Sequence, residues 1–369
     1  MRMALSEHSP VDAEAPRARD VILSRLRDAA VRLGAHPQDH GWRELYRLFA
    51  VALAAPASAP VFAAAAVEGA AARPESGDSH LVTVLGIALK TVCPDRFAFL
   101  VAPASVEARV AALEAIALKH GGALADMVRE RQNSFTGARR FLVPQVLLAA
   151  MSRNLPEGEG LRLCDLGTGL GLMPRQLNTP ELFERFAADL PWPHGVPAYR
   201  PIRLESRRGV DRDPLPDEMW VTACHGASSY YRVILDELQE CVSHPQVRTA
   251  PVAVSAVDLL DVGALRSFLA GHRISAVTLT YTLYQLAPTH RAQVLDVLSD
   301  SLALPGIVVV IEPDRELSAQ GCSVTVTEAA RGRRWRVAHV SDGHFIGRVS
   351  PLEDFDAFAR EFPIPVVNR

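Results

Sequence analysis

The sequence predicts an α/β protein with a Rossmann-like, doubly wound sheet, preceded by an all-helical N-terminal cap domain. Before about residue 155 the chain is patterned for helices alone, because apolar residues recur three and four positions apart. After that point, short apolar runs typical of buried strands alternate with helical segments. Such alternation is characteristic of a sheet with helices on both faces.

These patterns divide the chain into three parts. Residues 1–18 are poor in apolar side chains and rich in Pro, Asp, Glu and Arg, which predicts a disordered tail. Residues 19–155 are assigned to the cap domain, and residues 156–369 to the Rossmann-like domain. The helices expected in the cap domain lie within 21–34, 42–55, 106–122 and 139–155.

The Rossmann-like domain is expected to begin with a strand at 161–166. Further strands are expected within 201–211, 251–258, 274–286 and 306–314, followed by a terminal hairpin within 322–329 and 334–341. The helical pattern between them falls on 172–177, 180–190, 231–242 and 290–302, with a closing helix at 351–362. The proline-rich segment 192–201 is expected to be irregular.

The first strand leads into the motif around which this domain is arranged, LCDLGTGLGLM. Asp165 ends the strand, and Gly167, Gly169 and Gly171 alternate after it. Glycines at alternate positions let the chain turn through positive φ and bring bare backbone close to a ligand. In an open parallel sheet, nucleotide-like ligands bind at this place, beyond the carboxyl ends of the strands.

The motif resembles motif I of the class I S-adenosylmethionine methyltransferases, whose loop passes under the methionine part of the cofactor. The resemblance implies S-adenosyl-L-methionine as the cofactor and a sheet of the class I methyltransferase type. Asp165, Gly167, Gly169 and Gly171 would hold the methionine part. By the same resemblance, Asp211 at the end of the second strand would accept hydrogen bonds from the ribose, and Asp258 after the third would lie near the adenine.

A narrower resemblance covers most of the chain from about residue 42. The string RRGVDRDPLPDEMWVTACHGASSYYRVILDEL is similar to a central segment of a bacterial family of uncharacterised proteins with a methyltransferase-like core, and RQNSFTGARR resembles that family's Q-T-N-E-x-x-R stretch. The sequence departs from the pattern at Gly169, where the family has Ser, and around Ser134 and Phe135, where the family's acid is missing. Because the family has no assigned reaction, this likeness supports the fold more than the function.

Methyl transfer is an in-line displacement that depends largely on positioning, and an oxygen or nitrogen acceptor can also need a general base. The candidates for acting on the acceptor are Tyr281, Tyr284, His290, Glu312 and Asp314. The candidates for contacting the substrate are Gln132, Asn133, Arg139, His225 and Gln285. Ordinary structural roles are open to all of them, namely packing for the tyrosines and helix capping or surface turns for the others.

Arginines are also expected to crowd the rim of this site. They are Arg131, Arg139, Arg140, Arg203, Arg207, Arg208 and Arg212. Because arginine pairs well with carboxylate, sulfate or phosphate, the substrate is expected to be a small, anionic molecule. A solvated charged face is the alternative explanation of the same residues.

Composition limits the other classes of function. The net charge is −3, with 39 Lys+Arg against 42 Asp+Glu, which argues against nucleic acid as an obligatory partner. The five cysteines are scattered without a C-x-x-C pair, so neither a metal site nor a disulfide framework is expected. The alanine-rich run 51–72 is interrupted by Pro56, Pro60 and Glu68, so no membrane span is expected, and the protein is expected in the cytoplasm.

The sequence therefore favours a methyltransferase that uses S-adenosyl-L-methionine on a small molecule, in secondary metabolism. Two alternatives stay open. One is an enzyme on the same fold that cyclises or eliminates on an anionic substrate and transfers no methyl group. The other is a non-catalytic binding or assembly protein, in which the cap domain forms the face of a homodimer.

Overall fold

The computed structural model describes residues 10–33, 40–73, 78–188, 192, 194–226, 229–314, 316–317 and 321–367. The chain forms two compact units. The first, here the helical unit, comprises Met1–Ser134 and Pro216–Arg232, and the second, the sheet unit, comprises Phe135–Leu215 and Val233–Arg369. The sheet unit thus takes in residues 135–155, which the sequence pattern places with the N-terminal helices.

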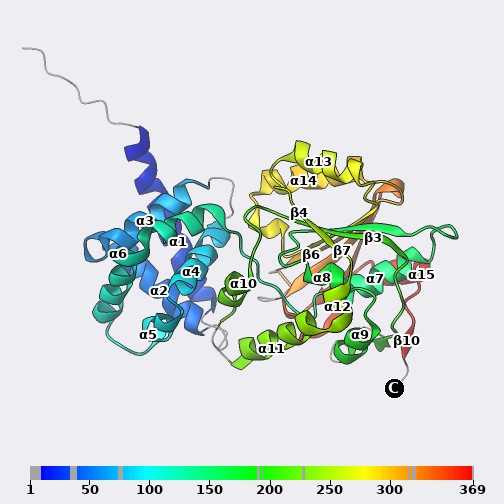
Figure 1. The fold of residues 1–369 in the computed structure, drawn as a ribbon, viewed down its shortest axis with the longest axis horizontal. Helices are drawn as coiled ribbons and strands as arrows, with labels where there is room; N and C mark the ends of the chain where they lie inside the picture. The colour runs from blue at the N-terminus through cyan, green and yellow to red at the C-terminus, as the bar shows by residue number, and fades with distance from the viewer. Residues whose placement is uncertain are drawn as a thin grey trace, which may run out of the picture. The chain divides into compact units, whose positions relative to one another are not determined.

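The helical unit is built from helices alone in its described part (Figure 1). They are α1 (Pro10–Leu33), α2 (His40–Ala54), η2 (Pro56–Ser58), α3 (Pro60–Ala71), α4 (Asp78–Val92), η3 (Pro94–Arg96), α5 (Phe97–Val101), α6 (Val106–Glu130) and α10 (Glu218–Cys224). Helix α10 comes from a distant part of the chain but packs against α4. Helix α1 begins at Pro10, inside the segment for which composition predicts disorder, and residues 1–9 of that segment lie outside the described residues. That this unit acts as a cap stays a prediction.

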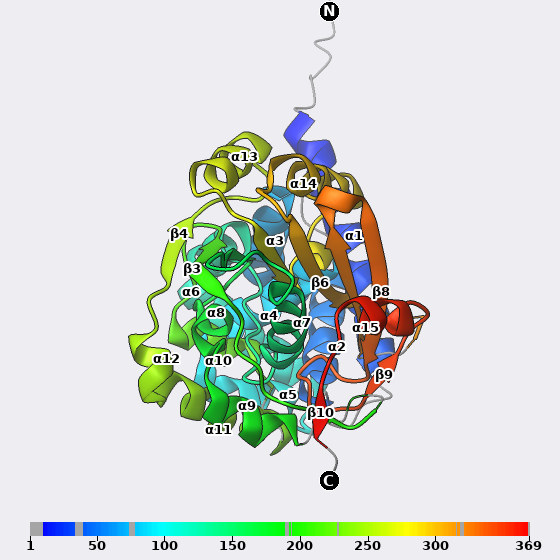
Figure 2. The ribbon, with the colours of Figure 1, turned by 90° about the vertical axis from the view of Figure 1, so that its right-hand side faces the viewer.

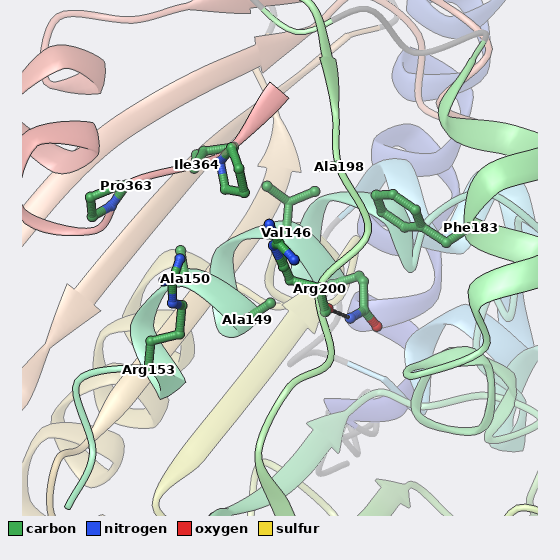
Figure 3. Close-up of a pocket in the computed structure, with 11 residues that line it drawn as sticks. Val146, Ala149, Ala150, Arg153, Phe183, Ala198, Arg200, Pro363 and Ile364 are labelled. Atoms are coloured by element: carbon green, nitrogen blue, oxygen red, sulfur yellow. Dashed lines mark hydrogen bonds between the residues drawn. The ribbon is translucent and has the colours of Figure 1, made fainter. Parts of the chain in front are cut away.

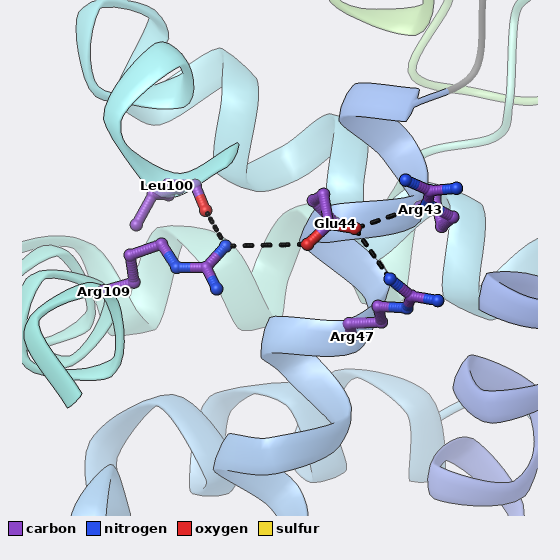
Figure 4. A network of polar contacts seen from close by, with 5 residues as sticks. All are labelled: Arg43, Glu44, Arg47, Leu100 and Arg109. Carbon is purple, nitrogen blue, oxygen red and sulfur yellow. Dashed lines mark hydrogen bonds and ion pairs between the residues drawn. The ribbon is translucent and has the colours of Figure 1, made fainter. Parts of the chain in front are cut away.

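Close helix packing and one acidic side chain organise the helical unit. A Cβ at Gly69 would lie 2.7 Å from the Val128 Cβ, so glycine lets α3 and α6 approach closely. Glu44 of α2 forms ion pairs with Arg43, Arg47 and Arg109, with N···O distances of 3.3, 2.9 and 3.9 Å (Figure 4). Arg109 of α6 also donates to the Leu100 carbonyl, so this network ties α2, α5 and α6 together.

The sheet unit is organised around an eight-stranded sheet in the order β4-β3-β1-β5-β6-β7-β8-β9. The five parallel strands are β1 (Leu161–Leu166), β3 (Leu204–Asp211), β4 (Ala253–Ala256), β5 (Ala276–Thr280) and β6 (Ile307–Pro313), and the antiparallel strands are β7 (Cys322–Glu328), β8 (Arg333–Val340) and β9 (Val349–Pro351). In chain order the parallel strands follow the doubly wound succession 3-2-1-4-5, which reverses between β1 and β5. The predicted α/β class is confirmed, and the mostly parallel sheet is compatible with a Rossmann-like fold.

Helices flank this sheet on both faces (Figures 1 and 2). They are α7 (Leu142–Ser152), α8 (Leu172–Gln176), α9 (Pro180–Ala187), α11 (Ser229–Ser243), α12 (Pro245–Thr249), α13 (Val262–Gly271), α14 (Pro288–Ser301) and α15 (Phe355–Glu361). On the face covered by α13 and α14, Leu166 and Leu279 of the strands are buried with Leu269 and Leu298 of the helices. A short pair, β2 (Val196–Pro197) with β10 (Val366–Val367), lies outside the main sheet.

Several element boundaries differ from the sequence pattern. Strand β5 ends at Thr280, whereas the apolar pattern extends to residue 286, because Tyr281 adopts a φ of +55° and Leu283–Gln285 form the 3₁₀ turn η4. Strand β4 ends at Ala256, so Asp258 lies in the loop after it. Among the described helices, none has the length and apolar character needed to cross a bilayer.

Candidate active site

The glycine motif lies at the carboxyl end of β1, where the order of the parallel strands reverses. Gly167, Gly169 and Gly171 have φ values of +73°, +58° and +68°, as their alternation predicts, and α8 begins directly after them. In doubly wound sheets this reversal opens the crevice in which ligands bind. The motif therefore occupies the position in the sheet unit where a ligand site is expected.

The three glycines meet different surroundings. A Cβ on Gly167 would lie 2.4 Å from Thr282 Oγ1, and one on Gly171 would lie 2.8 Å from Val254 Cγ2. A Cβ on Gly169 would meet only Thr136 Oγ1, at 3.4 Å. Gly167 and Gly171 are thus required by packing against the protein's own side chains, whereas the backbone at Gly169 is the part of the loop that a ligand could approach.

Asp165 is a structural anchor below this loop. Its side chain is buried, and Oδ1 accepts a hydrogen bond of 2.7 Å from Thr278 Oγ1 on β5. Burial raises the pKa of Asp165 to about 7 against the hydrogen bond from Thr278, which lowers it. The carboxyl group therefore joins β1 to β5 from inside the sheet, and it has little exposure to a ligand.

The raised pKa makes the stability of the sheet unit depend on pH through Asp165. Its pKa rises from an ordinary value of 3.8 to about 7 on folding, because the buried carboxyl group favours the protonated form. Its contribution to the free energy of unfolding is therefore complete below pH 3.8 and is lost as pH rises towards 7. Relative to wild type, Asp165→Asn should gain free energy of unfolding over this window, by at most about 1.4 kcal/mol per pH unit. Urea unfolding of both proteins at pH 4 to 8 measures the difference, and a difference that does not change with pH would contradict it.

Asp211 connects the end of β3 to the glycine loop. Its Oδ2 accepts from the Gly169 N–H at 2.7 Å, and its Oδ1 accepts from the Arg212 N–H at 2.8 Å. Burial raises its pKa, while these two backbone hydrogen bonds lower it. Each oxygen retains a second acceptor position, because a carboxylate offers about four. Asp211 thus lies beside the glycine loop with one acceptor position on each oxygen used by a backbone N–H, and its contact with the ribose stays a prediction.

Asp258 has protein partners on both oxygens. Oδ1 accepts from the Leu260 N–H at 2.9 Å, and Oδ2 pairs with Arg212 Nε at 3.3 Å. These contacts give Asp258 a structural role, in which it caps the turn after β4 and pairs with Arg212. Its predicted contact with adenine stays a prediction.

The segment after β5 is held by Glu312 of β6. Its Oε1 accepts from the N–H groups of Thr282 and Leu283, at 2.8 and 2.7 Å, and its Oε2 accepts from that of Tyr284 at 2.9 Å. Thr282 Oγ1 in turn donates to the Leu166 carbonyl at 3.0 Å, directly before Gly167. Burial raises the pKa of Glu312 to about 7. The carboxylate therefore caps η4, and only Oε2 keeps an acceptor position for another group.

The two tyrosines predicted to act on the acceptor are neighbours. The rings of Tyr281 and Tyr284 meet edge to face with centroids 6.0 Å apart, and Gln285 Nε2 donates to the Tyr281 carbonyl at 2.9 Å. Burial raises the pKa of Tyr281 well above its ordinary value of 10.0. Tyr281 is therefore suited to donate a hydrogen bond and unsuited to act as a base near neutral pH.

The structure brings the other candidates together only in part. His290 lies in the first turn of α14, and Asp314 accepts from Arg336 of β8 at 3.2 Å. Gln132 and Asn133 belong to the helical unit, where the Gln132 carbonyl accepts from Trp220 Nε1 at 2.7 Å. His225 is in the same unit, fully buried, with Nδ1 2.9 Å from the Val221 carbonyl oxygen. Asp314, the Gln132 carbonyl and His225 therefore make local structural contacts.

The segment 135–140 lies next to the glycine loop, but Thr136 makes this contact and not Arg139, the residue of the segment that the sequence indicates as a substrate contact. Arg139 is buried in a bidentate ion pair with Glu237 of α11, at 2.9 and 2.6 Å, which occupies the side chain expected to contact substrate. Thr136 is the residue that faces Gly169, and the Arg140 guanidinium lies 4.5 Å from the centre of the Tyr281 ring. Sequence reasoning assigned Thr136 no role, because its neighbours are set by the fold.

Protein groups occupy most of the expected arginine rim. Six of the seven bond inside their own unit: Arg131 to Asp217, Arg139 to Glu237, Arg140 to the Phe135 and Gly343 carbonyls, Arg203 to carbonyls of 155–159, Arg207 to the Pro174 carbonyl, and Arg212 to Asp258. The rim as a whole therefore gives little support to an anionic substrate. Arg140, Arg203 and Arg207 bond only to uncharged carbonyls, and of these three Arg140 is the buried one.

A groove of the sheet unit lies among residues that the sequence did not single out (Figure 3). Its lining includes Val146, Ala149 and Ala150 of α7 on one side and Pro363 and Ile364 on another, with Arg153 and Arg200 near them. None of its lining residues belongs to the predicted site. Within the described residues, no group of three His, Cys, Asp or Glu side chains could hold a metal ion.

Comparison with known proteins adds no assignment: no family model and no curated protein matches the sequence. The fold defines the class as an α/β protein with a mostly parallel sheet, which is compatible with a Rossmann-like fold.

Proposed function

We propose that the protein is a methyltransferase that uses S-adenosyl-L-methionine to methylate a small molecule of secondary metabolism. The observation that carries the proposal is the pairing of the Gly169 N–H with Asp211 at the reversal of the strand order. This pairing joins the half-buried loop after β1 to a carboxylate at the end of the adjacent strand β3. Such a site suits a nucleoside-containing ligand, since the loop backbone can be approached at Gly169 and the Asp211 carboxylate keeps open acceptor positions.

The residues fit the proposed cofactor at two of its parts. The loop around Gly169 would hold the methionine part, because a Cβ there meets only Thr136 Oγ1. Asp211 would accept hydrogen bonds from the ribose through the acceptor positions that the backbone leaves open. Bound S-adenosyl-L-methionine supplies an activated methyl group on a sulfonium. Asp165 supports the loop from beneath, through its bond to Thr278, and would make no direct contact.

The acceptor side of the site would be built by the segment after β5. Glu312 has a pKa of about 7 and one open acceptor position on Oε2, which suits a group that takes a proton from an oxygen or nitrogen acceptor. Tyr281 and Tyr284 would orient the acceptor, Tyr281 as a hydrogen-bond donor. Because Glu312 also caps η4, the same carboxylate would hold these tyrosines in position.

Titration calorimetry with S-adenosyl-L-methionine and S-adenosylhomocysteine tests the proposal on wild type, Gly169→Ala and Gly332→Ala. Both glycines have left-handed backbone, with φ of +58° and +60°, and a Cβ on Gly332 has nothing within 4 Å. The two variants therefore carry similar backbone strain, but only Gly169→Ala places a methyl group in the proposed site. We expect micromolar binding that weakens at least about tenfold, or about 1.4 kcal/mol, in Gly169→Ala alone.

Two outcomes would contradict the proposal. No binding of either ligand to wild type would favour the enzyme on the same fold that cyclises or eliminates without methylating. Equal binding to wild type and Gly169→Ala, with Gly332→Ala unchanged, would place the ligand away from the glycine loop. Circular dichroism of all three proteins verifies that each is folded when it is titrated.

A further inference from the structure

Arg140 is a buried cation that has no anionic partner among the described residues. The residue is 8% exposed. Its guanidinium donates to the Gly343 carbonyl through Nε at 3.1 Å and to the Phe135 carbonyl through Nη1 at 2.5 Å. It forms no ion pair with a carboxylate of the described residues, unlike Arg139 beside it. A guanidinium has five N–H donors, so three of them remain for another acceptor.

The side chain that Arg140 covers is also incompletely satisfied. The guanidinium lies 4.5 Å from the centre of the Tyr281 ring, and the Tyr281 hydroxyl is buried without a hydrogen bond of normal geometry to any described residue. Its neighbour is the thiol of Cys322, which is a weak partner. Tyr281 also has a φ of +55°, a conformation that costs a non-glycine residue about 1–3 kcal/mol and that concentrates at ligand sites.

Two acids act electrostatically on Cys322, the neighbour of Tyr281, and both have protein partners. Asp342 precedes Gly343 and accepts from the His344 N–H at 2.7 Å. Glu312 accepts the three N–H groups that begin η4. A buried, uncompensated charge is costly to a protein, and a bound anion with matching hydrogen-bond geometry offsets that cost.

We propose that Arg140 and Tyr281 form a subsite for a carboxylate group, with the guanidinium supplying the charge and the phenol a further donor. The subsite adjoins the glycine loop on both sides, because Tyr281 precedes Thr282, which contacts Gly167, and Phe135 precedes Thr136, which faces Gly169. Assigning the carboxylate to the methyl acceptor rests on the proposed function; the anion site itself does not. The acceptor is then a small carboxylic acid, held by its carboxylate beside Tyr284 and Glu312.

Binding of benzoate, followed by NMR or calorimetry, tests the subsite without any turnover, with benzamide as the uncharged analogue and inorganic phosphate as the other anion. The variants are Arg140→Gln, Arg140→Lys, Tyr281→Phe and, as a control with the same change of charge, Arg360→Gln on the exposed face of α15. We expect wild type and Arg360→Gln to bind benzoate equally and benzamide at least tenfold more weakly. Benzoate affinity should fall at least tenfold in Arg140→Gln and several-fold in Tyr281→Phe and Arg140→Lys, since lysine lacks the planar fork.

The proposal is overturned if wild type does not bind benzoate, if phosphate binds more tightly than benzoate, or if Tyr281→Phe and Arg140→Lys both bind as wild type does. The last two variants decide the matter should Arg140→Gln fail to fold. Titration with S-adenosyl-L-methionine separates the two proposals. Benzoate binding without cofactor binding leaves the carboxylate subsite standing and removes the methyltransferase, whereas the reverse result removes the subsite alone.

Discussion

Replacing Glu237 by alanine is expected to lower the free energy of unfolding by about 3–5 kcal/mol, since it would leave Arg139 as a buried charge without its partner. The two side chains are 9% and 10% exposed, and the guanidinium makes both hydrogen bonds to the carboxylate. Arg139 also lies over the Phe186 ring, at 5.2 Å from its centre, which covers part of the guanidinium. Urea unfolding at pH 7 measures the loss.

A matched control lies on the same helix. Glu240 of α11 pairs with Arg185 at 2.7 Å, but these side chains are 40% and 53% exposed. Glu240→Ala should therefore cost no more than about 1 kcal/mol. The double variant Arg139→Leu/Glu237→Leu should recover most of the loss, because it removes both charges together. A loss in Glu237→Ala no larger than in Glu240→Ala would contradict the argument.

Gly167→Ala is expected to cost about 2–5 kcal/mol of unfolding free energy. The left-handed conformation accounts for about 1–2 kcal/mol, and the new Cβ, 2.4 Å from Thr282 Oγ1, adds an overpacking cost of about 1–3 kcal/mol. Thr282 cannot swing aside freely, because it is buried and its hydroxyl donates to the Leu166 carbonyl. The same urea titration measures the loss.

Two further variants separate strain from packing. Gly332→Ala should show only the strain, because its Cβ meets no atom within 4 Å. Combining Gly167→Ala with Thr282→Ala removes the side-chain atoms nearest the clash, so the double variant should be more stable than the sum of the single losses implies, by about 1–3 kcal/mol. Additive losses would show that the contact between these residues is not the cause.

The fold could be predicted from local pattern because each strand and helix carries its own periodicity. The first strand was expected at 161–166 and is observed as Leu161–Leu166, and the terminal hairpin is observed as β7 and β8. The strand predicted within 274–286 is too long, since TYTLYQL has the composition of a strand but β5 ends at Thr280. What ends β5 is the φ of Tyr281 and the cap from Glu312, a contact between residues far apart in the chain.

The candidate site was less predictable, because its contacts depend on which segments the fold brings together. Asp165 and Asp211 were identified from their places at strand ends, but their partners, Thr278 and the Gly169 amide, were not. Thr278 carried a usable signal, since a hydroxyl inside the apolar strand AVTLT must find a hydrogen bond when buried. Arg140 carried none that distinguishes it from Arg139, because the burial and partners of adjacent arginines follow from tertiary structure.

The contacts among Gly167, Thr282 and Glu312 bear on how this sequence could change over evolutionary time. Thr282 excludes a side chain at Gly167, and Glu312 fixes the backbone that places Thr282 there. A substitution at any one of these positions should be destabilising while the other two residues are unchanged, although the three residues lie at the ends of three different strands. Among related sequences, substitutions at these three positions should therefore occur together, and substitutions on the neighbouring surface should occur independently of them.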